Sequence, residues 1–262
     1  MKITIKNSWD SLSWKEYEQL EQILNTDIPS DYKTVHVIAL LSGLTVEEIE
    51  RIPVNQFNKI LPALEFLQTE PETHYHQFEY TINGREYDFK GKLQEITTAQ
   101  YIDYRAYISE DQKDIVKLMS VFLIPKGHEY NDGYDMEQVI NDINDMCWLD
   151  LRAAAFFFQD SVSSVHTHFE VIFGKDPESN EEEQDTAGEE ANTERHNQSG
   201  GAFEQYGLLP LVLRVCEYSN DGFDTVMSWS VCQTFYIASY IITKNKYDEQ
   251  QIKQMQLKNK QR

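Results

Sequence analysis

The sequence predicts a mainly α-helical protein that also carries a small antiparallel β-sheet, an α+β arrangement. Apolar residues recur at helical spacing along most of the 262 residues, and several of these runs begin with a capping residue. One stretch instead alternates apolar and polar residues on both sides of Asn83-Gly84, which is the pattern of a β-hairpin. A third stretch, residues 175–202, follows neither pattern and divides the chain.

Capping signals place the first helices. Ser13 with Glu16, and Thr45 with Glu48, have the capping-box spacing, in which each side chain accepts a hydrogen bond from the other residue's backbone N–H. Gly43 is expected to end a helix over residues 32–42, because glycine adopts the left-handed conformation of helix ends without strain. Another helical run, residues 54–67, contains Pro62, and this proline would kink or divide it.

The clearest local signal is the hairpin. Residues 78–82 and 85–89 alternate around Asn83-Gly84, and this dipeptide tolerates the positive φ angles of a type I′ turn. A two-stranded hairpin alone is only marginally stable. The alternating residues 1–6 are therefore the candidate for a third strand of the sheet.

Helices are expected again after the hairpin. Thr97 and Gln100 repeat the capping-box spacing. Asp111 or Asp114 is expected to begin the next helix, whose apolar face extends to Leu123, shortly before Pro125. Two further helices are predicted over residues 136–146 and residues 149–173.

Three adjacent phenylalanines, Phe156, Phe157 and Phe158, are candidate partner-binding residues. Successive residues of an α-helix point about 100° apart, so one core face cannot bury all three rings. Either this helix is central to the fold or part of it contacts another protein.

Residues 175–202 are expected to form an acidic, disordered linker. They include no aromatic and no branched aliphatic residue, so ordering them would cost backbone entropy with little apolar burial in return. The adjacent Glu181, Glu182 and Glu183 repel one another and favour an extended chain. The linker would separate a helical body with the small sheet, residues 1–174, from a small module, residues 203–243.

The C-terminal module is expected to be a helical hairpin. Two apolar runs, residues 206–216 and 223–242, are separated by the turn-forming residues of the sequence SNDG. So small a module hides few aromatic side chains, and four of them are further candidate partner-binding residues, with core packing as the alternative. These residues are Tyr206, Trp229, Phe235 and Tyr236. The polar tail, residues 244–262, is expected to fray.

Composition limits the partners and the compartment. A net charge of −21 repels phosphate backbones and anionic lipid, so neither nucleic acid nor membrane is an expected partner. The three cysteines lie in apolar runs and show no metal-binding spacing, which is typical of buried free thiols. The sequence begins without the apolar core of a signal peptide, and its apolar runs fall short of a membrane span. We therefore expect a cytoplasmic protein.

No catalytic motif and no metal-binding motif is recognisable, so we expect a protein that is not an enzyme and needs no cofactor. His166 and His168 would face opposite sides of a helix, whereas helical zinc sites use residues four apart. His74 and His76 would share one face of an extended segment, where surface histidines are the favoured interpretation and a weak metal site the alternative. The region around Asp142 lacks the glycine and the terminal glutamate of a calcium loop.

Three segments of this sequence resemble a group of phage and prophage proteins, many of them from Bacteroides-type hosts. The segments are residues 41–53 (LSGLTVEEIERIP), 96–103 (ITTAQYID) and 119–125 (MSVFLIP). The general plan of the chain is similar to that of the tail assembly chaperones of long-tailed phages: an acidic, mostly helical body extended by a second small module. The pieces YGLLPLV, from Tyr206, and FDTVM, from Phe223, resemble that second module.

The resemblance implies a role in virion assembly inside the bacterial host cytoplasm. The body would bind the phage tape-measure protein through the helix with Phe156, Phe157 and Phe158, and the C-terminal module would recruit tail-tube subunits. An acidic body with an aromatic groove suits this role, because it could cover the apolar stripes of a long helical partner. The alternative is a structural or head-packaged virion protein of a crAss-like phage.

Overall fold

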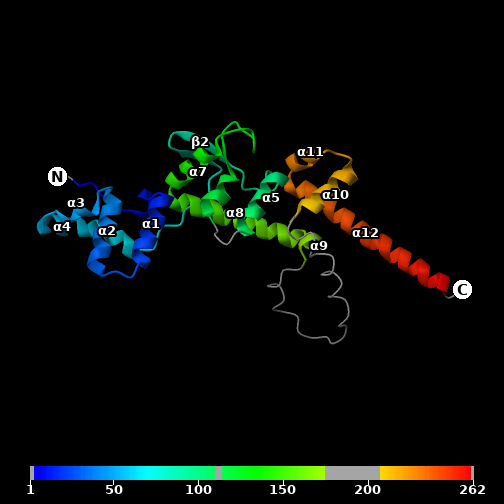
Figure 1. Cartoon of the computed structure of the whole chain (residues 1–262), viewed down its shortest axis with the longest axis horizontal. Helices are drawn as coiled ribbons and strands as arrows, with labels where there is room; N and C mark the ends of the chain where they lie inside the picture. The colour runs from blue at the N-terminus through cyan, green and yellow to red at the C-terminus, as the bar shows by residue number, and fades with distance from the viewer. Residues whose placement is uncertain (1–2, 110–113, 175–206, 261–262) are drawn as a thin grey trace, which may run out of the picture. The chain divides into compact units, whose positions relative to one another are not determined.

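The computed structural model describes residues 3–109, 114–174 and 207–260 (Figure 1). They form a mainly α-helical structure with one small three-stranded antiparallel sheet, so the predicted fold class is confirmed. The predicted linker, residues 175–202, lies outside the described residues, as does Tyr206. None of the helices in the described ranges combines the length and the apolar character that a membrane crossing requires.

The chain divides into two compact units. Unit 1 consists of Met1–Phe89 and Asp114–Phe157, and unit 2 consists of Lys90–Lys113 and Phe158–Arg262. This division differs from the predicted one, in which residues 1–174 form a single body and residues 203–243 a tethered module.

Backbone hydrogen bonds within unit 2 account for this difference. The N–H of Thr98 donates to the carbonyl of Trp229 (2.9 Å), and the N–H of Val231 donates to the carbonyl of Ile96 (2.9 Å). The C-terminal helices are therefore joined to a segment that precedes them by more than a hundred residues. Composition around the linker gives no sign of this long-range pairing.

Within residues 3–78, unit 1 contains six helical segments. They are η1 (Trp9–Ser11), α1 (Trp14–Asn25), α2 (Ser30–Ser42), α3 (Val46–Glu50), α4 (Val54–Ile60) and η2 (Leu61–Gln68). The capping boxes at Ser13, before α1, and at Thr45, before α3, form as predicted. Gly43 ends α2 in the left-handed conformation (φ 68°), and Pro62 lies at the start of η2, where the predicted single helix divides.

The sheet has the strand order β1 (Glu79–Ile82), β2 (Arg85–Phe89) and β3 (Leu123–Pro125). In the turn between β1 and β2, Asn83 (φ 51°) and Gly84 (φ 77°) both have positive φ angles, as the predicted type I′ turn requires. Tyr80 lies opposite Tyr87 in this pair, and Phe89 lies opposite Leu123 in the next pair.

Two predictions about the third strand are wrong. Residues 3–6 are not a strand, and the N–H of Lys6 instead donates to the carbonyl of Leu41 at the end of α2 (3.0 Å). The third strand is β3, and Leu123 belongs to it rather than to the preceding helix, α6 (Ile115–Ser120). The helix ends early because Leu123 and its neighbours satisfy their backbone groups by pairing with β2.

Helix α7 (Met136–Asp145) lies beside the sheet (Figure 1). The two are joined by a buried carboxylate, that of Asp142. Asp142 is 1% exposed and accepts hydrogen bonds from Tyr87 Oη, from Arg85 Nη1 (2.8 Å) and from Asn83 Nδ2 (3.0 Å). These donors come from the hairpin turn and from β2. The carboxylate therefore fixes α7 to the hairpin.

The apolar core of unit 1 lies around α1, α2 and the start of α8 (Trp148–His168). One cluster of buried residues contains Leu12, Leu20, Val37, Leu41, Trp148 and Leu149. A second cluster, Ile38, Ala39 and Ile49, packs α2 against α3. Tyr17 stacks flat on Trp148, with ring centroids 4.0 Å apart.

Unit 2 contains α5 (Thr98–Ser109), α9 (Glu170–Phe173), α10 (Leu209–Ser219), α11 (Phe223–Ser228), α12 (Val231–Lys260) and the second part of α8. Its core includes Val212, Val215, Val226 and Ala238. The predicted second helix of the hairpin is two helices, α11 and α12. They separate at Trp229 and Ser230 because that backbone pairs with residues 96–98.

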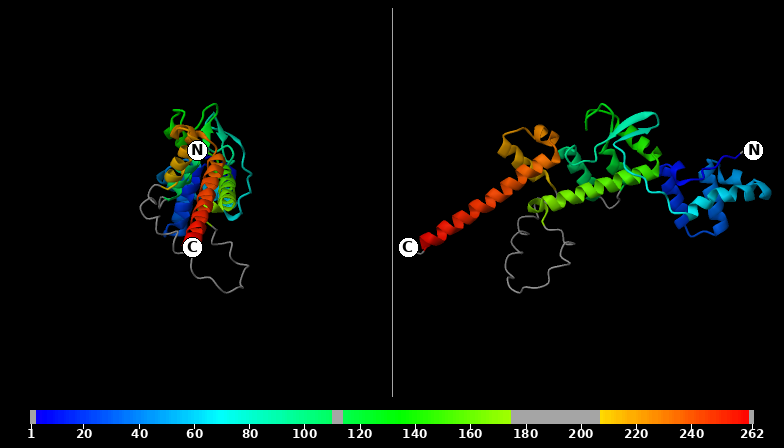
Figure 2. Two further views of the ribbon diagram at one scale, coloured as in Figure 1. Left: turned by 90° about the vertical axis from the view of Figure 1, so that its right-hand side faces the viewer. Right: turned by 180° about the vertical axis from the view of Figure 1, so that it is seen from behind.

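Helix α12 continues to Lys260, so the prediction that residues 244–262 fray is wrong for the part that the structure describes. This stretch is rich in lysine and glutamine, which favour helices, and Glu249 precedes Lys253 at the spacing that stabilises an exposed helix. Residues 243–250 are all exposed. Figure 1 and the right-hand view of Figure 2 show that the C-terminal half of α12 extends beyond α10 and α11.

Candidate functional site

The three adjacent phenylalanines of α8 have three different environments. Phe156 is 54% exposed, whereas Phe158 is 1% exposed and packs edge-on against Tyr104. Phe157 is half-buried and stacks on His76, with ring centroids 3.7 Å apart. The divergence that helical geometry predicts is therefore present. Phe156 is the member of the set with most of its surface available to a partner.

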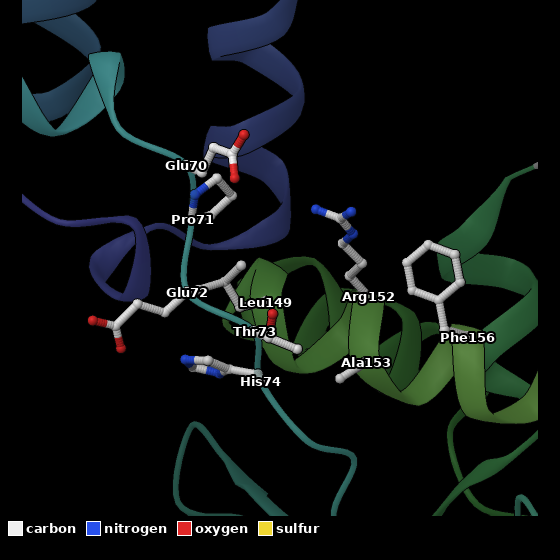
Figure 3. Close-up of a pocket in the computed structure, with 9 residues that line it drawn as sticks. All are labelled: Glu70, Pro71, Glu72, Thr73, His74, Leu149, Arg152, Ala153 and Phe156. Atoms are coloured by element: carbon white, nitrogen blue, oxygen red, sulfur yellow. The ribbon is translucent and has the colours of Figure 1, made fainter.

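Phe156 lies beside a pocket in unit 1. The pocket has a volume of about 340 Å³ and is bounded by one side of α8 and by the extended segment that follows η2 (Figure 3). Its lining residues are Glu70, Pro71, Glu72, Thr73, His74, Leu149, Arg152, Ala153 and Phe156. The guanidinium of Arg152 lies 5.3 Å from the centre of the Phe156 ring, within cation–π range. The pocket thus combines an exposed aromatic ring with charges of both signs.

The predicted binding residues of the C-terminal helices also differ strongly from one another in exposure. Phe235 is 1% exposed and belongs to the core, and Trp229 is half-buried. Tyr236 is 57% exposed, and its hydroxyl forms a hydrogen bond with His168 Nε2 (2.8 Å). Core packing is thus the role of Phe235, and Tyr236 remains available to a partner.

Two more exposed tyrosines share a helix face with Tyr236. Tyr240 and Tyr247 are 53% and 60% exposed and follow Tyr236 by four and eleven residues. At about 100° per residue, these spacings place all three side chains within about 40° of one another around the helix axis. We call Tyr236, Tyr240 and Tyr247 the tyrosine stripe. Sequence reasoning missed it, although the spacing alone could have shown it.

A second candidate site in unit 1 centres on His74. Its Nδ1 lies 2.8 Å from Asp150 Oδ1, and its Nε2 lies 3.1 Å from Asp10 Oδ1. Donor atoms of His74, Cys147 and Asp150 all lie within 4.8 Å of one another. These side chains come from η1, from the extended segment at the pocket and from the start of α8.

Two tryptophan rings bring these segments together. The Trp9 ring donates from Nε1 to the carbonyl of Thr69 (3.0 Å), which precedes His74 by five positions. The Trp148 ring donates from Nε1 to the carbonyl of Trp9 (2.9 Å), and the two rings meet edge-on with centroids 5.6 Å apart. Trp9 therefore connects the segment that carries His74 to the start of α8.

Backbone contacts fix the start of α8 in the same place. Ser13 and Cys147 form an antiparallel bridge, and the N–H of Trp148 donates to the carbonyl of Leu12 (3.1 Å). Asp10 and Cys147 are therefore held near each other by main-chain bonds. Positions 10, 74, 147 and 150 are spread widely along the sequence, so local spacing could not reveal this cluster.

The surroundings shift the ionisation of two of these groups. The hydrogen bond to the Asp150 carboxylate raises the pKa of His74, and the Asp10 carboxylate acts in the same direction. Burial raises the pKa of the Cys147 thiol, and this increase is partly offset by hydrogen bonds from the backbone N–H groups of Asp150 and Leu149. The cluster thus favours a charged imidazole between two carboxylates and a protonated thiol.

The geometry does not suit a nucleophilic cysteine. A cysteine nucleophile needs a neighbouring base that accepts its proton. Both ring nitrogens of His74 are engaged by carboxylates, at Asp150 and at Asp10. The donor set of nitrogen, sulfur and oxygen atoms is better suited to holding a metal ion.

The other histidines considered from the sequence have separate partners. His166 Nε2 forms a hydrogen bond with Tyr101 Oη (3.0 Å), whereas His168 bonds with Tyr236. His76 stacks on Phe157. Each of these three histidines thus has an aromatic residue of its own as a neighbour.

Comparison with known proteins found no match: no family model, no curated protein and no solved structure matches the chain.

Proposed function

We propose that this chain is a non-enzymatic assembly factor that binds other proteins, as a phage tail assembly chaperone does. The observation that carries the proposal is the tyrosine stripe, a row of three exposed aromatic side chains on one face of α12. Tyrosine is enriched at protein interfaces, because its ring provides apolar contact area and its hydroxyl a hydrogen bond. The resemblance of the sequence to tail assembly chaperones supplies the kind of partner.

Each of two surfaces would bind a different partner protein. Phe156, with Arg152 beside it, would bind the tape-measure protein in unit 1. The tyrosine stripe would bind tail-tube subunits in unit 2. Aromatic residues and arginine dominate the binding energy of many interfaces, which supports both assignments. The protein would act in the cytoplasm of the bacterial host.

A binding experiment tests the first surface. Truncating an aromatic anchor of an interface typically costs about 2 kcal/mol or more, so Phe156→Ala is expected to weaken tape-measure binding about 30-fold. Tyr75→Ala is the matched control, since Tyr75 is an exposed aromatic residue of unit 1 that does not line the pocket. Equal binding by both variants would reject the assignment of Phe156.

The second surface is tested with tail-tube subunits. Replacing all three residues of the tyrosine stripe with alanine is expected to abolish tube binding and to spare tape-measure binding. Ile252→Ala is the control, because Ile252 is exposed on the same helix but lies about 140° around the axis from Tyr247. If purified particles retain this chain in stoichiometric amounts, a structural virion protein is the better description.

A further inference from the structure

The His74 cluster has the dimensions of a metal site. In a tetrahedral zinc site, with bonds of about 2.0–2.1 Å to nitrogen and oxygen and about 2.3 Å to sulfur, donor atoms lie about 3.3–3.6 Å apart. His74 Nδ1 and Asp150 Oδ1 are 2.8 Å apart, and the donor atoms of His74, Cys147 and Asp150 lie within 4.8 Å of one another. Side-chain movements of about 1 Å would bring them to zinc distances.

We propose that His74, Cys147 and Asp150 bind one Zn²⁺ ion in unit 1. Thiolate and imidazole ligands together select zinc over the magnesium and calcium ions that carboxylates alone would favour. A water molecule would complete the tetrahedron, since the described residues bring three protein donors together. This inference departs from the expectation, based on local spacing, that the protein holds no metal.

Asp10 occupies the position of a supporting carboxylate. A histidine that binds zinc through one ring nitrogen usually donates its other N–H to a carboxylate or carbonyl, which fixes the orientation of the ring. With Nδ1 on the metal, His74 Nε2–H would donate to Asp10 Oδ1, which lies 3.1 Å away. Asp10 is therefore a positioning residue.

The backbone around the ligands is already ordered. The bridge between Ser13 and Cys147 and the bond from Trp148 Nε1 to the carbonyl of Trp9 hold two of the three segments together. The bond from Trp9 Nε1 to the carbonyl of Thr69 holds the third. Binding would thus require side-chain adjustment rather than the folding of a loop.

Proton release accompanies binding. Zinc binds the thiolate of Cys147 and the unprotonated Nδ1 of His74, so the thiol proton and the Nδ1 proton pass to solvent.

Cobalt titration of the full-length chain tests the site. After dialysis against a chelator, the protein is expected to bind one Co²⁺ per chain and to develop thiolate-to-cobalt charge-transfer absorption in the near ultraviolet. Added Zn²⁺ should displace the cobalt and remove this absorption. Cys147→Ser should lose the charge-transfer band, whereas the control variants Cys216→Ser and Cys232→Ser should keep it.

The Asp10→Asn variant tests whether Asp10 supports the ligand His74 without binding the metal itself. This variant should keep the charge-transfer band but bind zinc about 10–100-fold more weakly. Circular dichroism of each variant shows whether it is folded. The proposal is overturned if wild-type protein binds no cobalt saturably, if the band persists in Cys147→Ser, or if zinc affinity is unchanged in Asp10→Asn.

Discussion

At the scale of single residues, Asp142 shows how one side chain connects two elements. It lies on α7, and its carboxylate accepts hydrogen bonds from Asn83, Arg85 and Tyr87 of the hairpin. Burial alone would raise the pKa of Asp142, but these hydrogen bonds outweigh burial and lower it. The ionised carboxylate is therefore the form that the folded protein stabilises.

Asp142→Asn tests this connection. The amide loses the negative charge and presents an NH2 group where the carboxylate accepted from the buried Tyr87 hydroxyl, so we expect the free energy of unfolding at neutral pH to fall by about 1–3 kcal/mol. Because the pKa of Asp142 is lowered by folding, its contribution is present above the unfolded value of about 3.9 and is lost as the pH falls toward the folded value.

Urea unfolding of wild type and variant between about pH 3 and pH 7 measures both effects. Asp145→Asn is the control, since Asp145 also accepts from Asn83 but is exposed. Equal stability losses in the two variants at neutral pH would show that burial of Asp142 has no special role.

At the scale of elements, the sequence predicts the turns and helix ends whose structure depends on neighbouring residues. The hairpin at Asn83-Gly84 and the capping boxes at Ser13 and Thr45 are confirmed, because their signals lie within a few positions of one another. Strand β3 was not predicted, because its pairing with β2 joins residues more than thirty positions apart. The separation of α11 from α12 has the same kind of cause, the pairing of Ser230 with Thr97.

In the candidate sites too, features set by neighbouring residues could be predicted and features set by long-range contacts could not. The divergence of Phe156 and Phe158 could be predicted from helix geometry, but only the structure shows which ring is buried. The cluster of His74 with Cys147 and Asp150 could not be predicted, since distant segments must first fold together.

Shortening α12 tests whether its C-terminal half contributes to the fold. A chain that ends at residue 243 is expected to lose helical circular dichroism but to unfold within about 0.5 kcal/mol of the full chain, because residues 243–250 are exposed. A chain that ends at residue 234 is the control and should be clearly destabilised, since it lacks the buried Phe235 and Ala238. A large loss of stability in the longer variant would mean that the helix end packs against the protein.

At the scale of the whole molecule, the protein combines a strong negative charge with exposed aromatic side chains. A net charge of −21 opposes association between copies of the chain, while exposed rings such as Phe156 and Tyr247 offer apolar contact area to a partner. This combination suits a protein that covers apolar surfaces of a partner.

The most direct test of the proposed function is the amount of soluble tape-measure protein after co-expression with this chain. We expect the tape-measure protein to be largely insoluble alone and to appear in the soluble fraction, bound to this chain, when both are expressed. The Phe156→Ala variant should recover less of it than the Tyr75→Ala control. A tape-measure protein that remains insoluble beside the wild-type chain, or that is equally soluble without it, would contradict the account.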